Sequence, residues 1–307
     1  MTARPQVVPR NYFGIRHAPV DRSVPPVYHD SLDATERITG ALELEILALS
    51  PVHVGSGSYE LAGEEIGKDP VRRAGRLIIP GASIKGMCRQ IFEAITASGS
   101  PFDRDEHHKA GRRGGEGKPL SVAAAVFGTL GLQGRIGFDD AVPVVDVEPV
   151  EIAPERIRLS VAYPPQKEVG RRFYGPLPAG ADQPATVPAL AIPAGAVLRT
   201  RVRFRNLTRA GLGGVLTSLG VGRFTPRLGG GKYDDFGWAR FRATGYRLRP
   251  RGFARDEGWE REPGAVAAFV KDCQGNVPLA AAGEAALDLL TRKLQFPAGV
   301  TPEGKRL

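Results

Sequence analysis

Residues 41–48 give the clearest strand pattern in the chain, because apolar and polar side chains alternate there. Leu42, Leu44 and Ile46 fall on one side, and glutamates lie between them. Alternation with a period of two is typical of a strand with one buried face. Further strands are expected at residues 77–79, 135–138, 197–207 and 238–247.

Helical spacing follows the turn at Pro80-Gly81, where apolar side chains recur every three or four positions up to Ile95. Ser83 lies where a helix N-cap is wanted, so we expect a helix that begins there. Residues 55–73, which start with Gly55-Ser56-Gly57, are expected to form a flexible loop before this helix. Other helical segments are expected at 122–127, 210–219 and 280–294.

The order of these elements predicts an α+β fold with long irregular connections. Gly (39) and Pro (26) together exceed a fifth of the chain, which favours many turns over a helical bundle. A Pro-rich arm (1–38), a core (39–250) with a long insertion (about 147–193) and a C-terminal extension (251–307) are the expected divisions. Strands that do not alternate regularly with helices suit an elaborated antiparallel sheet.

Charge narrows the class of partner. The formal net charge is +9 and the sequence pI is about 9.8, which favours a polyanion such as a nucleic acid. Two isolated cysteines, Cys88 and Cys273, exclude a zinc knuckle and a disulfide framework. Because no signal peptide and no long apolar stretch is present, we expect a cytoplasmic protein without a membrane partner.

The strand at 197–207 places four arginines on one face, about 7 Å apart along the strand. That spacing is close to the phosphate spacing of an extended nucleic acid, and guanidinium groups bind phosphate well. A solvated outer face is the alternative. The four side chains are Arg199, Arg201, Arg203 and Arg205.

The Gly-rich segment at 220–240 combines backbone freedom with positive charge. Consecutive glycines let backbone amides approach an anion closely. A phosphate-binding P-loop is excluded, since Tyr233 stands where a Ser or Thr would follow Lys232. The candidate contacts to RNA are Arg223, Arg227, Gly229, Gly230, Gly231 and Lys232.

The start of the expected helix at 83–96 is a second candidate for an anion. Free amides at a helix start favour negative charge, and Ser83 lies among them. Lys85 and Arg89 are four residues apart and therefore share one face above that end. A solvated helix face would explain the same residues.

Five segments, in the same order, resemble the RAMP superfamily, the repeat-associated proteins of CRISPR systems. The resemblance runs from about residue 42 to 242. The matching stretches are SPVHVGSG (50–57), IPGASIKGMCR (79–89), VFG with GRIGFDDA (126–141), GRRFY (170–174) and LGGGKYDDFGW (228–238).

This resemblance implies a modified RNA-recognition-type, ferredoxin-like fold with the Gly-rich loop beside the first helix. In type III backbone subunits the Lys and Arg of that helix hold the guide RNA, and here these are Lys85 and Arg89. The resemblance also implies a hairpin "thumb" that interrupts pairing of guide and target RNA, and the insertion at 147–193 is the candidate. Its contacts would be Arg171, Arg172, Phe173 and Tyr174.

Type III subunits of this kind often carry a catalytic aspartate between the first strand and the first helix. Asp69 is the best positional match, although Glu64 and Glu65 compete for the role. Cleavage would need Mg²⁺ held by this carboxylate while a 2′-hydroxyl attacks in line. His53 is either a contact to RNA or a packing residue.

The sequence therefore favours a CRISPR RNA-binding subunit that works with other effector subunits, and leaves metal-dependent endoribonuclease activity open. One alternative is a structural adaptor that contacts mainly protein. Another is a metal-independent ribonuclease that processes CRISPR RNA. That reaction would need a His near the Gly-rich loop, and no His follows residue 108 in the chain.

Overall fold

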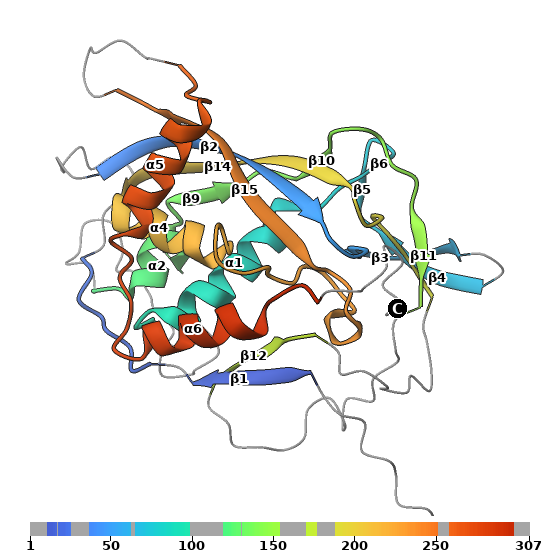
Figure 1. Ribbon diagram of the computed structural model, residues 1–307, viewed down its shortest axis with the longest axis horizontal. Helices are drawn as coiled ribbons and strands as arrows, with labels where there is room; N and C mark the ends of the chain where they lie inside the picture. The colour runs from blue at the N-terminus through green and yellow to red at the C-terminus, as the bar shows by residue number, and fades with distance from the viewer. Residues whose placement is uncertain are drawn as a thin grey trace, which may run out of the picture.

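The protein was analysed as a computed structural model of residues 1–307. The structure describes residues 11–16, 18–25, 37–62, 65–98, 119–129, 131–153, 170–176, 188–250 and 258–297. The architecture is mixed α+β (Figure 1). Of the helices in these ranges, none is both long and apolar enough to cross a membrane.

An antiparallel sheet forms the centre of the molecule. Its strands run in the order β10–β14–β2–β15, and β9 also pairs with β14. The alternating segments predicted from the sequence form its three long strands. The bounds are β2 (Arg37–Ala48), β9 (Ile136–Phe138), β10 (Val142–Pro143), β14 (Val197–Thr208) and β15 (Ala239–Leu248).

Helices cover one face of this sheet, and the core lies between the two layers (Figure 1). Leu42, Leu44 and Ile46 of β2 are fully buried there, as is Phe92 of the first helix. Gly214 lies so close to the Phe92 ring that a Cβ would be 2.5 Å from it, so small residues let the helices pack tightly. The helices are α1 (Gly81–Ile95), α2 (Val122–Phe127), α4 (Arg209–Ser218), α5 (Pro263–Gln274) and α6 (Gly283–Lys293).

The prediction of a flexible loop at 55–73 is wrong. The chain forms a hairpin there, which joins a second sheet in the order β11–β13–β4–β3. The hairpin was missed because its apolar side chains face outward, so the sequence pattern has no buried face to reveal. The strands are β3 (Gly55–Ala62), β4 (Glu65–Pro70), β11 (Val150–Ile152) and β13 (Ala189–Ala191).

Two strands far apart in sequence, β1 (Tyr12–Arg16) and β12 (Gly170–Tyr174), form an antiparallel ribbon, with Gly14 opposite Arg172. The ribbon joins the expected arm to the expected insertion. Residues 154–169 and 177–187 of that insertion lie outside the described residues. The remaining short elements are β5 (Arg72–Arg73), β6 (Arg76–Leu77), β7 (Gly128–Thr129), β8 (Leu132–Gln133) and the 3₁₀ turn η2 (Lys232–Asp234).

Two helix predictions need correction. Pro80, not Ser83, is the N-cap of α1, and Ser83 lies inside the first turn. The helix at 263–274 was missed, although Glu262 caps it by accepting hydrogen bonds from the amides of Gly264 and Ala265. A glutamate before Pro263 is a weaker sequence signal for a helix start than Ser, Thr or Asp.

Candidate nucleic-acid interface

The Gly-rich loop packs against His53, which lies five positions after the end of β2. A Cβ on Gly229 would lie 2.0 Å from the carbonyl oxygen of His53, and the φ of Gly229 is +75°. The amide of Gly230 donates to the same carbonyl at 2.8 Å. Only glycine fits at Gly229, because any side chain would be strained by the backbone and would strike His53. Gly231 also has a positive φ and precedes η2.

His53 is a buried packing residue. Its Nδ1 lies 2.7 Å from the carbonyl oxygen of Leu190, and since a carbonyl can only accept, Nδ1 carries the hydrogen. Burial lowers the pKa of His53, and the nearby charge of Lys68 lowers it further. The ring is therefore neutral at pH 7. The structure does bring a histidine to the Gly-rich loop, as an RNA-processing site would require, but the side chain is covered.

Arg227 serves the interior of the protein. Its side chain is buried, and its guanidinium donates to the carbonyl oxygens of Phe236 (2.7 and 2.9 Å) and Gly175 (3.1 Å). It also lies 4.2 Å from the ring centroid of Trp238. Burial lowers the pKa of Arg227 to about 9, so it stays charged at pH 7. Direct contact of Arg227 with RNA stays a prediction, although its hydrogen bonds are made within the protein, whereas Arg223 in the same loop is exposed.

The ribbon β1–β12 places side chains of the GRRFY motif against aromatic rings of β1 and of the Gly-rich segment. Phe173 is buried and stacks on Phe13, with ring centroids 5.8 Å apart. The ring centroids of Tyr174 and Tyr233, which belongs to the Gly-rich segment, are 6.4 Å apart. Arg172 Cζ lies 5.2 Å from the ring centroid of Tyr12. The motif thus ties the ribbon to the Gly-rich loop.

A small cavity of about 50 Å³ opens where the ribbon, α1 and the Gly-rich segment meet. Arg172, Arg227 and Lys232 line it, and no carboxylate is found among its described lining residues. Its volume is enough for about three or four water molecules or for one small anion. The other lining residues are Met87, Gln90, Ile91, Phe173, Tyr174 and Leu294.

Lys232 is the partly buried cation of this cavity. Burial lowers the pKa of its ammonium group, and the positive charge of Arg227 lowers it further. Because Lys232 lies near the positive charge of Arg227 and is partly removed from water, a bound anion would stabilise its charged form. The cavity is therefore suited to a phosphate group.

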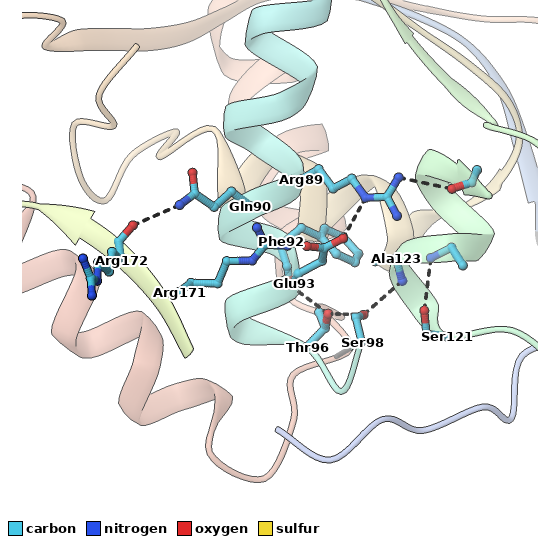
Figure 2. A network of polar contacts seen from close by, with 12 residues as sticks. Arg89, Gln90, Phe92, Glu93, Thr96, Ser98, Ser121, Ala123, Arg171 and Arg172 are labelled. Atoms are coloured by element: carbon cyan, nitrogen blue, oxygen red, sulfur yellow. Dashed lines mark hydrogen bonds and ion pairs between the residues drawn. The ribbon is translucent and has the colours of Figure 1, made fainter. Parts of the chain in front are cut away.

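A buried carboxylate on α1 links this helix to β12 (Figure 2). Glu93 binds Arg89 through one oxygen, at 2.7 Å from Nε, and Arg171 of β12 through the other. Arg89 also donates to the carbonyl of Gly128 at 3.2 Å, and Gln90 donates to that of Arg172 at 3.0 Å. Figure 2 shows these side chains bridging α1, α2 and β12.

The start of α1 is already occupied by a carboxylate. The amide of Gly81 donates to Asp140 Oδ1 at 2.9 Å, so this amide is not free for an external anion. Lys85 lies one turn further along the helix, and burial together with the charge of Arg89 lowers the pKa of Lys85. Lys85 and Arg89 thus form a basic pair in the middle of the helix rather than at its N-terminus.

Comparison with protein-family models matches residues 45–232 to the RAMP superfamily. The match covers more than half of the chain and includes every residue that lines the cavity except Leu294. The chain belongs to the RAMP superfamily. RAMPs are CRISPR-associated proteins, and membership points to an RNA-binding role. A comparison with curated proteins found no match.

In this RAMP protein, Asp69 lies near the end of β4, at the base of the hairpin. Ser56 Oγ donates to Asp69 Oδ2 at 3.1 Å, and Arg72 Nε lies 3.7 Å from Oδ1. No group of three or more potential metal ligands occurs among the residues that the structure describes. Asp69 can therefore offer Mg²⁺ one carboxylate, which fits an ion that takes its other ligands from RNA and water. Of the two competing carboxylates, Glu64 lies outside the described residues and Glu65 is the first residue of β4.

The arginine ladder of β14 is interleaved with acids from the neighbouring strand. Arg199 stands opposite Glu45 and Arg201 opposite Glu43. Arg201 lies 3.1 Å from Glu43, and Arg203 is paired with Asp139. This open face of the sheet is largely neutralised, which makes it a poor phosphate ladder. The sequence could not reveal this, since Glu43 and Glu45 lie on β2, more than 150 positions before the arginines of β14 that they face.

Proposed function

We propose that this RAMP protein binds the guide RNA of a type III CRISPR effector complex and holds its backbone at the basic cavity. The observation that carries the proposal is the meeting of Arg172 and Lys232, from distant segments, around a cavity whose described lining contains no carboxylate. Phosphate contacts position a nucleic acid without reading its sequence, as a guide-binding subunit requires.

The topology supports this assignment. The elements β2, α1, β9 with β10, β14, α4 and β15 follow one another in the order βαββαβ. In the sheet, the fourth of these strands lies beside the first, followed by the third and the second. We infer that the core is ferredoxin-like, as in RNA-recognition domains.

A second basic pair lies on a different face of α1 from Met87, Gln90 and Ile91, which line the cavity. Lys85 and Arg89 share one face of the helix, and Glu93 holds Arg89 in place from below. A guide strand that contacts both groups would pass around α1, with Lys85 and Arg89 on one side and Lys232 at the Gly-rich loop on the other. The thumb remains a proposal as well, since β11 and β13 bound it and most of it lies outside the described residues.

Two variants with the same loss of charge test the proposal. Arg172→Ala with Lys232→Ala is expected to weaken binding of single-stranded RNA by about tenfold or more, because charge-assisted contacts are lost. Arg199→Ala with Arg205→Ala removes two exposed charges from the open sheet face and is expected to leave the affinity nearly unchanged. Fluorescence anisotropy with the full chain measures both.

Salt dependence supplies the second measurement. The log–log slope is expected to fall by about 0.7 in the cavity variant, since the cavity holds one phosphate and each phosphate contact contributes about 0.7 for a single strand. Equal losses in both variants would show that only net charge matters. A flat salt dependence of the wild type would support the adaptor role instead.

Asp69 is proposed to cleave target RNA. Its carboxylate would hold Mg²⁺, which supplies stabilisation of the charge that develops on the phosphate. Asp69→Asn keeps an acceptor for Ser56 but removes the charge. It is therefore expected to abolish Mg²⁺-dependent cutting of a complementary target by the guide-loaded complex, as measured on a denaturing gel.

The matched control is Asp146→Asn, which changes an exposed carboxylate paired with Arg76. This variant should cut at the wild-type rate, and both variants should retain guide RNA on purification. Cutting that survives Asp69→Asn would remove this residue from the site. Loss of the guide in Asp69→Asn would point to a role in binding or folding.

A further inference from the structure

A second cavity lies between α2, the end of β14 and the start of α4 (Figure 1), and is called the α2–α4 cavity below. Its volume is about 220 Å³, against about 50 Å³ for the basic cavity, and the two share no described lining residue. The larger volume gives room for an organic molecule rather than for a single small ion. Most of its lining is apolar and includes Val24, Pro25, Val122, Val126, Leu207 and Pro278.

The charged part of the α2–α4 cavity is positive. Arg37 at the start of β2 and Arg135, which directly precedes β9, line it, and no acid is found among its described lining residues. Ala210 and Gly211 in the first turn of α4 also line it, so the positive end of this helix dipole faces the same space. Two arginines and a helix start therefore favour an anion here.

Arg135 is a buried charge that no described carboxylate pairs with. It is 5% exposed, and its Nη1 donates to the carbonyl oxygen of Asn206 at 2.6 Å, whereas Nη2 is buried without a hydrogen-bond partner. Burial, together with the positive charge of Arg37, lowers the pKa of Arg135 to about 10, so Arg135 stays charged at pH 7. Buried charges in proteins are ordinarily paired, and an anion bound in this cavity would supply the pair.

We propose that the α2–α4 cavity binds a small organic acid, with its carboxylate at Arg37 and Arg135 and its apolar body between α2 and α4. A carboxylate accepts two parallel hydrogen bonds from a guanidinium group, which matches the donors of an arginine. An inorganic anion would leave the apolar walls without a contact. A neutral apolar molecule would leave Arg135 without a pair.

The volume of the cavity favours a free acid over the end of a peptide, because only the last residue of a peptide would fit inside it. Since Nη2 of Arg135 is covered by the cavity wall, its guanidinium group turns toward the carboxylate when the ligand binds. The site does not depend on RNA binding, because the basic cavity is formed by other residues.

Titration of the RNA-free full chain with hexanoate, followed by ligand-observed NMR, measures the affinity. A ligand with about eight non-hydrogen atoms is expected to bind with a Kd of about 1 mM. Hexanol keeps the chain without the charge, and acetate keeps the charge without the chain, so each should bind about tenfold more weakly or worse. The peptide acetyl-Gly-Gly-Leu should also bind more weakly than hexanoate. Hexanol or acetate binding as tightly as hexanoate, or the peptide binding more tightly, would overturn the assignment to a small apolar acid.

Three variants locate the bound hexanoate. Arg37→Ala, at a half-buried residue, is expected to weaken binding by about tenfold, since one charged contact is lost. Arg199→Ala removes the same charge from the exposed sheet face and should leave the Kd unchanged. Arg135→Met replaces the buried charge by an apolar side chain, so it should abolish binding while the unfolding temperature stays close to that of the wild type.

Two results would remove the ligand from this cavity. One is a Kd that is the same in the wild type and in Arg37→Ala. The other is the absence of saturable binding by the wild type at hexanoate concentrations up to about 20 mM, where a millimolar site is filled. If Arg135→Met does not fold, the comparison of Arg37→Ala with Arg199→Ala still decides.

Discussion

Glu93→Ala is expected to lower the free energy of unfolding by about 3 kcal/mol or more. The side chain of Glu93 is 2% exposed and binds two arginines, of which Arg171 is 13% exposed. Its removal leaves Arg89 and Arg171 as neighbouring, partly desolvated positive charges. Urea unfolding followed by circular dichroism measures the loss.

A surface pair provides the control for Glu93→Ala. Asp272 is paired with Arg209 at 2.8 Å, but the two side chains are 56% and 42% exposed. Asp272→Ala should therefore cost about 1 kcal/mol or less. Since Arg171 belongs to β12, Glu93→Ala should also speed hydrogen exchange in the ribbon β1–β12. Equal losses in the two variants would contradict a structural role for the buried network.

Gly229→Ala is expected to destabilise the protein strongly. The new Cβ would lie 2.0 Å from the carbonyl oxygen of His53, and the backbone must also keep its positive φ. The steric clash and the strained backbone together should lower the free energy of unfolding by about 3 kcal/mol or more. RNA affinity should fall as well, because the loop that carries Lys232 must move. Thermal unfolding and RNA binding measure the two effects.

Two other glycines separate the causes. Gly222 has the same φ of +75° but nothing within 4 Å of an added Cβ. Gly222→Ala should therefore show only the cost of the positive φ, a loss of about 1 kcal/mol in the free energy of unfolding. A Cβ on Gly230 would be 3.5 Å from the His53 ring, an ordinary contact. Gly230→Ala should therefore be nearly neutral. If all three variants behave alike, contact with His53 is not what fixes the loop.

The sequence predicted the central sheet and α1 because their periodic apolar positions face a common core. Leu42, Leu44 and Ile46 are all buried as expected, and the helices at 122–127 and 210–219 were also predicted correctly. The β3–β4 hairpin could not be found in this way. Its apolar side chains, such as Ile66, point into solvent, and Gly55-Ser56-Gly57 resembles a loop.

The candidate site was predicted as separate residues, and the structure adds their pairing. Lys232 and Arg172 meet at one cavity, as a motif list alone could not show. Arg227 and His53 were expected near RNA, but both are buried, because their polar atoms satisfy backbone carbonyls of neighbouring loops. Asp140 at the start of α1 was missed, since it approaches Gly81 from a distant strand end.

The ribbon β1–β12 limits the order in which parts of the chain can fold during synthesis. Gly14 of β1 pairs with Arg172 of β12, so β1 cannot form its ribbon until a segment 158 residues later has been synthesised. At 5–20 residues per second this delay is about 10–30 s during synthesis. Throughout that time the apolar Phe13, which later stacks on Phe173, has no partner on β12. The N-terminal strand is thus translated first but docks late, after α1 and much of the sheet have been synthesised.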